Sequence, residues 1–225
     1  MALTPSKAEV GKVENVPLRV VVADMLRKAI VNGRMKPGTP IIEMALAEQL
    51  NVSRAPVREA IQILENDGLI ETVAYKGKRV KPLTLKEVEE VYSLREQFEA
   101  FAIRRIVERK VDVSELHTHS DAMFSAAERG DLAALNVSDE AFHRALIRLA
   151  DHGLMLSFWD NLYLRIRQIM ALRNSANRDL RAVARNHPPI IAAIEKRDMI
   201  LAISLISDHT RSASQIAPEE LGLSS

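Results

Sequence analysis

The chain has 225 residues, of which 47% are hydrophobic and 27% charged, a balance typical of a folded protein with one large or two small domains. The absence of cysteine excludes disulfides and thiolate metal sites. No apolar run approaches the roughly 18 residues that span a membrane, and the N-terminus lacks the apolar segment of a secretory signal, so we expect a cytoplasmic protein with no membrane partner. Aromatic residues make up only 4%, and few segments alternate as strands do, which favours a mainly α fold.

The net charge of +1 is distributed unevenly along the chain. Residues 17–82 hold eleven Lys and Arg against seven Asp and Glu, a net of +4, whereas residues 83–225 carry −3. A basic excess confined to one part of a chain is a weak indication of a nucleic-acid partner. Residues 1–16 are polar and show no periodicity, and we expect a flexible N-terminal arm there.

The first third of the chain predicts three short helices and a hairpin. Gly33 closes the first helix and Ser53 can cap the third. The hairpin is indicated by β-branched residues around a glycine-bearing turn. The four elements cover 18–33, 43–51, 53–67 and 69–80. Three helices followed by a hairpin form a winged helix-turn-helix, which we assign to residues 17–82.

The third helix begins with the sequence SRAPVREA. Pro56 is its third residue, where a missing N–H costs nothing because first-turn N–H groups have no partner within the helix. Arg54 and Arg58 share one face of the N-terminal turn, the part of a helix-turn-helix that enters the major groove, where arginine can bind guanine. The alternative, two arginines on a solvated surface, does not account for the preceding short helix, the serine cap and the wing. A second basic group lies at the hairpin tip and its return strand, where phosphates are expected: Lys76, Lys78, Arg79 and Lys81.

The run GRMKPGTPIIEMALAEQLNVSRAPVREAIQILENDGLI resembles the DNA-binding domain of the GntR family of bacterial transcription regulators. The PG turn, the LAxxL helix, SRxPVREA and the DGLI step recur in this order within residues 17–81. By this resemblance, operator contacts fall on Ser53, Arg54 and Arg58 of the recognition helix, and Lys76 and Gly77 lie where the wing tip reaches the minor groove. Some members carry an arginine where this chain has Met44, a departure that affects one operator contact.

From Leu85 onward the sequence predicts long helices with short connections. On a helical wheel over 138–150, Asp139 and His143 fall on the apolar side one turn apart, as half of a metal site would. His187 and His209 would lie about 33 Å apart in one continuous helix. A break at 196–198 would instead form an antiparallel helix pair and bring both histidines level with each other, so that the four side chains converge. The alternative is that each histidine is an ordinary hydrogen-bonded residue beside an apolar face.

Residues 85–217 resemble the all-helical effector domain, called FCD, of the FadR branch of the GntR family. DEAFHRAL corresponds to the Asp-x-x-x-His motif of that domain, and His187 and His209 stand where its other two metal histidines recur. The resemblance therefore implies a divalent metal ion held by Asp139, His143, His187 and His209. Histidine-rich ligation favours zinc or nickel. A departure follows His187, where two prolines replace the usual helix-forming residues.

Two arginines fall on otherwise apolar helix stripes. Arg95 lies between Tyr92 and Ala102, and Arg173 continues a stripe that starts at Phe158. A charge directed into a core is costly unless it is paired. For Arg95 the sequence leaves two alternatives open: an intrahelical ion pair with Glu99, or, together with Arg173, binding of a carboxylate ligand over the metal. The effector domains that this part of the chain resembles commonly bind small organic acids.

These observations predict a two-domain DNA-binding transcription regulator controlled by a small organic acid. We expect a homodimer on a pseudo-palindromic double-stranded operator, because one winged helix reads only a half-site. The effector domain, residues 85–217, would also provide dimerisation, and residues 218–225 would form a C-terminal tail. The rival hypothesis is a metal-dependent hydrolase in which the three histidines and the aspartate activate water, although no separate acid or base is placed by a motif.

Overall fold

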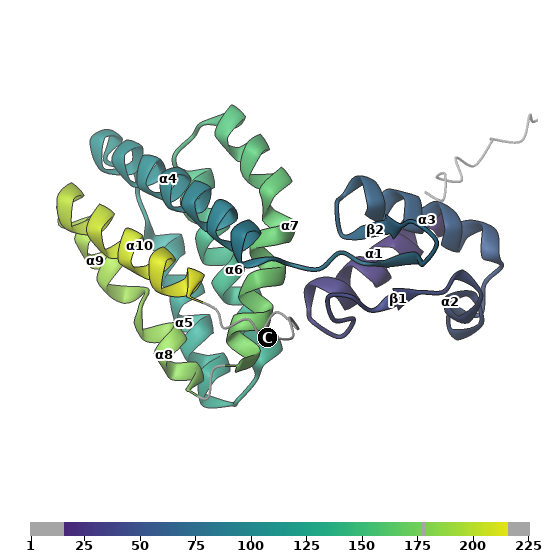
Figure 1. Cartoon of the computed structure of the whole chain (residues 1–225). Coiled ribbons are helices and arrows are strands. Elements are labelled where there is room, and N and C mark those ends of the chain that lie inside the picture. The colour runs from purple at the N-terminus through teal and green to yellow at the C-terminus, as the bar shows by residue number, and fades with distance from the viewer. Residues whose placement is uncertain (1–15, 177–178, 216–225) are drawn as a thin grey trace, which may run out of the picture.

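The computed structural model describes residues 16–176 and 179–215. Figure 1 shows a small N-terminal unit and a larger bundle of helices, joined by an extended segment that runs from the sheet to α4 (Leu85–Arg109). The predicted C-terminal tail, residues 218–225, lies outside the described residues, as does the predicted N-terminal arm except for Val16.

The N-terminal unit is a winged helix-turn-helix, as predicted. Its strands form an antiparallel sheet in the order β1-β3-β2, in which Ile70 pairs with Val80. β1 was not predicted, because a strand of two residues carries too little pattern to stand out in a sequence. The elements are α1 (Leu18–Val31), β1 (Pro40–Ile41), α2 (Glu43–Leu50), α3 (Arg54–Asn66), β2 (Ile70–Val73) and β3 (Gly77–Val80).

Helix α3 is amphipathic, and its apolar stripe anchors it in the N-terminal core. Val57, Ala60, Ile61 and Leu64 are fully buried at helical spacing. Ser53 stands at the N-cap position as predicted, but its side chain makes no capping hydrogen bond. On the opposite side of the helix start, Arg54 and Arg58 remain exposed.

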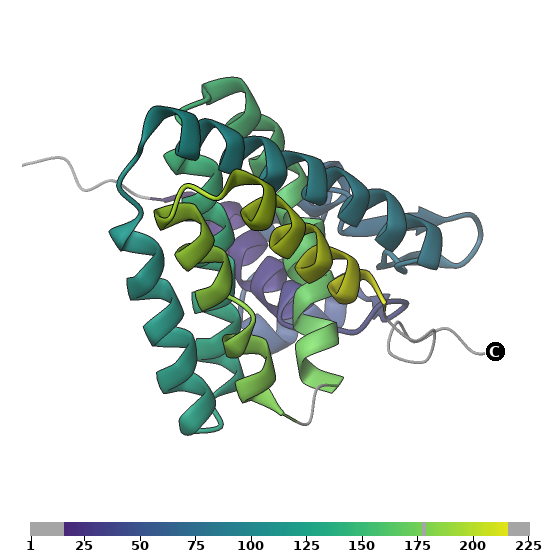
Figure 2. The ribbon, with the colours of Figure 1, turned by 90° about the vertical axis from the view of Figure 1, so that its left-hand side faces the viewer.

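The larger unit is a helical bundle with its own core. Thr84 and Glu87 form a reciprocal capping box that begins α4. Figure 2, which faces the bundle, shows α10 lying along α4. Every helix in the described part of the chain is too short or too polar to cross a bilayer. After α4 the helices are α5 (Ser114–Glu128), α6 (Leu132–Leu149), α7 (Gly153–Ala176), α8 (Leu180–Arg185), α9 (Pro188–Glu195) and α10 (Met199–Ser214).

The break between α9 and α10 falls at residues 196–198, where the sequence predicts it. Arg197 adopts a left-handed backbone conformation with φ of 58°, and the Asp198 side chain accepts a hydrogen bond from the Leu201 amide to begin α10. Pro188 and Pro189 occupy the first two positions of α9, where no intrahelical N–H bond is lost. The two prolines therefore begin this helix rather than disrupt it.

The two units meet along α7. Its Arg165 donates a hydrogen bond of 2.5 Å to the carbonyl oxygen of Gly68, directly after the recognition helix. Arg167 donates to the Asn32 side chain at the end of α1, at 3.2 Å, and also pairs with Glu140 of α6 at 2.9 Å. The start of α7 differs from the predicted stripe, because Phe158 is 55% exposed rather than part of the core.

Candidate DNA-binding surface and metal centre

The turn between α2 and α3 directs the N-terminus of α3 into solvent. Asn51 ends α2 in the left-handed conformation, with φ of 50°, which asparagine tolerates better than most residues. Beyond this turn, the Arg54 and Arg58 side chains are 60% and 62% exposed. Both approach the carboxylate of Glu43 at the start of α2. The two predicted base-reading arginines therefore lie together on an open surface.

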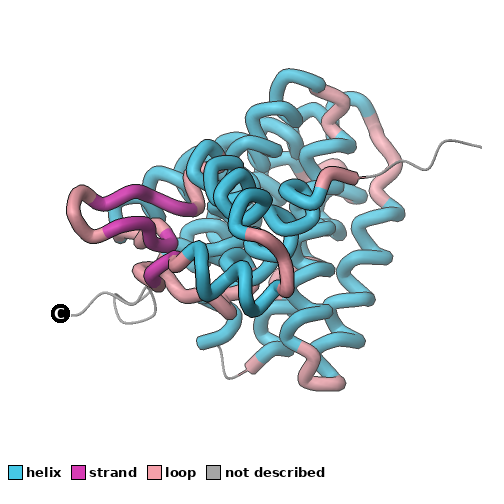
Figure 3. Tube along the Cα trace, turned by 90° about the vertical axis from the view of Figure 1, so that its right-hand side faces the viewer, coloured by secondary structure: helices cyan, strands magenta, loops and turns pink. Residues whose placement is uncertain are grey.

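The wing brings a second group of predicted DNA contacts to the surface. Figure 3, which faces the N-terminal unit, shows the β2–β3 hairpin projecting past the helices. Lys76 and Gly77 are exposed at its tip, and Gly77 has a φ of 84°, which favours glycine. Lys78 is less free, because its ammonium already pairs with Glu65 of α3. Tyr75, which was not among the predicted contacts, is fully exposed beside Lys76.

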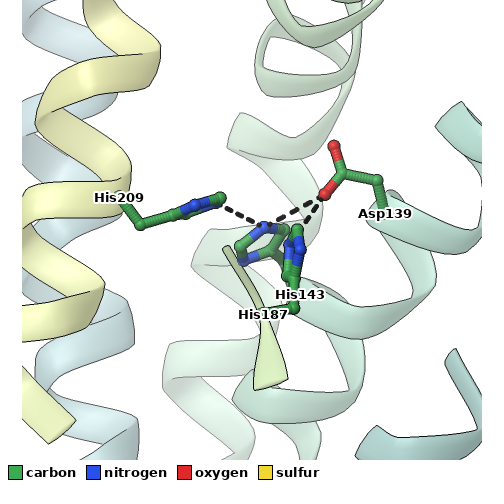
Figure 4. A group of neighbouring side chains, drawn as sticks. All are labelled: Asp139, His143, His187 and His209. Carbon is green, nitrogen blue, oxygen red and sulfur yellow. Dashed lines mark hydrogen bonds and ion pairs between the residues drawn. The ribbon is translucent and has the colours of Figure 1, made fainter. Parts of the chain in front are cut away.

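The four predicted metal ligands converge inside the bundle, as Figure 4 shows. One ligand atom from each of Asp139, His143, His187 and His209 lies within 4.8 Å of all the others. Asp139 Oδ1 is 3.0 Å from His187 Nε2 and 3.5 Å from His143 Nε2, which in turn is 3.2 Å from His209 Nε2. His209, at 8% exposure, is the least buried of the four. α6 supplies two ligands, α10 supplies one, and the residue before α9 supplies the last.

Polar neighbours orient the ligand side chains towards one another. His143 Nδ1 lies 3.1 Å from Glu99 Oε2, and His187 Nδ1 lies 3.1 Å from the Val183 carbonyl oxygen. These acceptors place the imidazole hydrogen on Nδ1 and leave Nε2 as a lone-pair donor inside the cluster. Asp139 Oδ1 and His187 Nε2 are buried and make no hydrogen bond within the described residues, despite their proximity. Two unsatisfied lone-pair donors facing one point fit a cation better than a hydrogen-bond network.

The electrostatics of the cluster favour the unprotonated forms of Asp139 and His209, but not that of His143. Burial and the Arg95 charge lower the pKa of His143, but Glu99 and Asp139 outweigh them and hold that pKa above the ordinary histidine value. Burial lowers the pKa of His209, and the neighbouring His187 and His143 lower it further, so that it lies well below the ordinary histidine value. Burial would raise the pKa of Asp139, but the imidazoles of His143 and His187 outweigh burial and hold that pKa well below its usual range. A carboxylate and a neutral imidazole are the forms that bind metal.

Arg95 forms the intrahelical ion pair with Glu99 that was the first of its two predicted alternatives. Within the described residues, part of its guanidinium remains free for the second alternative, binding of a carboxylate ligand. Its Nε donates a hydrogen bond of 2.7 Å to Glu99 Oε1, and both side chains are fully buried. Its Nη2 is buried without a hydrogen-bond partner in the described part of the chain, as is the Tyr92 hydroxyl, whose ring centroid lies 5.1 Å from the Arg95 guanidinium carbon. Burial raises the pKa of Tyr92, opposed by the charges of Arg95 and then Arg173. Arg173 itself is half-buried rather than buried.

A cavity of about 270 Å³ lies between α4 and α10 and reaches this region. Tyr92 and Thr210, the residue after His209, belong to its lining. Neither Arg95 nor Arg173 lines this cavity. Tyr92 therefore both lines the cavity and lies beside the Arg95 guanidinium.

Comparison with known proteins decides the family. Residues 18–80 match the bacterial regulatory proteins of the gntR family, and residues 90–212, more than half of the chain, match the FCD domain. The chain belongs to the GntR family. The predicted resemblance is thereby confirmed, and the protein is a DNA-binding transcription regulator rather than an enzyme. The hydrolase alternative receives no support.

Individual relatives of this GntR-family regulator agree. A probable D-xylose utilization operon transcriptional repressor of Paenarthrobacter nicotinovorans is 32% identical over 84% of this chain and 83% of its own length. A gluconate operon transcriptional repressor of Bacillus licheniformis is 31% identical over 82% of this chain and 78% of its own. A solved GntR regulator from Rhodococcus sp. RHA1 has the same fold, with a TM-score of 0.78 at 24% identity over 93% of this chain and 100% of that one.

Two polar residues of the centre were not assigned to it from the sequence. Glu99 was considered only as the partner of Arg95, yet its second oxygen faces His143. Asn174 of α7 lies with its Nδ2 3.4 Å from Asp139 Oδ2 and 2.8 Å from Asn136 Oδ1, and it is almost fully buried. Helical spacing could have indicated that Asn174 faces the core, because it lies four residues after Met170 and eight after Ile166, which are both buried in α7.

Proposed function

We propose that this GntR-family regulator binds a divalent metal ion through Asp139, His143, His187 and His209, and that a small carboxylate bound beside the ion controls its binding to DNA. The observation that carries the proposal is the pair of buried, unsatisfied ligand atoms, Asp139 Oδ1 and His187 Nε2, inside a cluster of four donor groups. Three imidazoles and one carboxylate suit zinc or nickel better than magnesium or calcium. When bound, such an ion supplies positive charge and a coordination position for an organic acid.

The effector class follows from the donors beside the cluster. Arg95 Nη2 and the Tyr92 hydroxyl are buried hydrogen-bond donors with no partner among the described residues. A carboxylate accepts hydrogen bonds from both kinds of group, and arginine binds it with particular strength. The cavity between α4 and α10 offers an approach through Tyr92. The Bacillus relative is named for a gluconate operon, and gluconate is itself a carboxylate, which fits this class.

The DNA contacts proposed are Ser53, Arg54 and Arg58 in the major groove and Lys76, Gly77 and Lys78 at the wing. A homodimer would place two such surfaces on a pseudo-palindromic operator. Helix α7 could transmit effector binding to these surfaces, because it contacts both units. Its Asn174 lies beside Asp139, a proposed metal ligand, and its Arg165 donates a hydrogen bond to the Gly68 carbonyl oxygen. An effector alters operator affinity only insofar as it prefers one arrangement of the two units.

Three experiments test the proposal, one each for the DNA contacts, the metal ion and the effector. The purified wild-type protein is first used to select duplexes from a random-sequence library, and a recurring pseudo-palindrome is expected. Elemental analysis of protein never exposed to chelator is expected to find about one divalent ion per chain. A thermal-shift panel of mono- and dicarboxylates, including aldonates, is then run with metal-loaded and metal-stripped protein. An acid that raises the melting temperature only of the loaded protein supports the effector site, whereas a metal-free protein that also fails to take up zinc contradicts it.

A further inference from the structure

Glu43 occupies an unexpected place for an acidic residue, because it stands between the two arginines of the recognition helix. Its Oε2 accepts a hydrogen bond of 3.2 Å from Arg58 Nε and lies 3.8 Å from an Arg54 Nη2 nitrogen. Its side chain is 22% exposed, whereas those of both arginines are about three times as exposed. A carboxylate on a surface meant for polyanionic DNA opposes binding unless it serves another purpose.

A role in helix stability alone does not explain this contact. An acidic residue in the first turn of α2 does interact favourably with the helix dipole. That interaction requires only a negative charge near the helix N-terminus, and it does not depend on the direction in which the carboxylate points. Here the carboxylate points across the turn to α3, fifteen residues further along the chain, and it contacts both arginines.

The nitrogen that Arg58 uses for this contact is informative. A guanidinium presents five N–H donors in a planar fork. Because Nε is directed at Glu43, the two terminal nitrogens of Arg58 remain available as an end-on pair. Bidentate binding of guanine O6 and N7 requires two donors side by side. The same carboxylate also offsets the repulsion between the two neighbouring cations.

We propose that Glu43 is a positioning residue that sets the sequence specificity of the operator complex. It holds Arg58 by Nε so that the terminal nitrogens face base edges, and its charge disfavours DNA on which the arginines find no guanine. The proposal rests on the proposed base-reading role of Arg54 and Arg58. It predicts that Glu43 contributes to discrimination between sequences more than to affinity for DNA in general.

The test measures the ratio of dissociation constants for a scrambled duplex and for the duplex that the wild type selects from a random library. Glu43→Ala and Glu43→Asp should each lower this ratio about tenfold, part of the roughly 5- to 150-fold discrimination of a bidentate arginine–guanine pair. The aspartate variant retains the charge at the start of α2, but its side chain is too short for the contact with the arginines. A lower ratio in this variant is therefore caused by loss of the contact, not by loss of charge or by misfolding. Glu48→Ala is the matched control, because Glu48 is an exposed acid of the same helix with no ion pair among the described residues, and its ratio should not change.

A double-mutant comparison identifies the partner. In an Arg58→Ala background, Glu43→Ala should change the ratio by less than about twofold, because the side chain it positions is gone. The proposal is overturned if Glu43→Asp keeps the wild-type ratio, if Glu48→Ala lowers it equally, or if the effect of Glu43→Ala persists without Arg58. Failure of the wild type to select any sequence would contradict the proposed operator contacts instead, so the two failures are distinguishable.

Discussion

Replacing Glu99 by glutamine should destabilise the effector domain by about 3–5 kcal/mol, the usual cost of leaving a buried ion without its partner. Glutamine has almost the same shape as glutamate, so the change removes charge rather than volume. The Arg95 guanidinium, at 1% exposure, then has no anion within hydrogen-bond distance, because its only carboxylate contact in the described residues is the 2.7 Å bond to Glu99. The substitution also weakens the group that faces His143 Nδ1, and loss of such a partner typically lowers metal affinity about 10- to 100-fold.

Urea unfolding followed by tryptophan fluorescence measures the first effect. The chain has a single tryptophan, Trp159, which is buried in the core of the helical bundle, so its signal follows that unit alone. Glu90→Gln is the matched control, because Glu90 forms an exposed i,i+4 pair with Lys86 on the same helix and should contribute less than about 0.5 kcal/mol. The double variant Arg95→Met/Glu99→Gln should recover part of the loss, since no uncompensated charge remains. Stability of Glu99→Gln within about 1 kcal/mol of wild type would refute the reasoning.

Three further predictions concern DNA and metal. Arg58→Ala should weaken binding to the selected duplex by about 1–3 kcal/mol and relax base preference without altering urea unfolding, and unchanged binding would show that the recognition helix is misassigned. Lys76→Ala should weaken binding to all duplexes alike and reduce the slope of log affinity against log salt by about one, whereas Lys78→Ala should do so less, because Glu65 already holds that ammonium. His143→Ala should eliminate the divalent ion found by elemental analysis, and an unchanged metal content would exclude this cluster as the site.

Features encoded locally could be predicted from the sequence. The order of helices and hairpin follows from apolar spacing and from turn residues such as Gly33. The meeting of His187 and His209 could be predicted because a polar triplet at 196–198 interrupts an otherwise apolar run, and an interrupted run folds back on itself. Their ring centroids lie 4.8 Å apart in the structure.

Contacts between distant segments could not be predicted where neither a motif nor helical spacing indicated them. Glu99 meets His143 only because α4 and α6 pack together, and 44 residues separate the two in the chain. Asn174 reaches Asp139 in the same way from α7. The prediction for Phe158 was wrong, because the buried stripe at the start of α7 runs through Met155 and Trp159 and leaves Phe158 outside it.

The two alternatives that the sequence offered for Arg95 are not exclusive, and the reason is geometric. A guanidinium is a rigid plane, so the bond from Nε to Glu99 fixes where the remaining nitrogens point, and Nη2 is left buried without a partner in the described residues. The other oxygen of Glu99 faces His143 Nδ1 and fixes the imidazole of a proposed metal ligand. One buried carboxylate therefore orients a group that would hold the ion and a group that would hold the organic acid. Because both would depend on the same side chain, metal and effector should each strengthen the binding of the other by the same factor, as linkage requires.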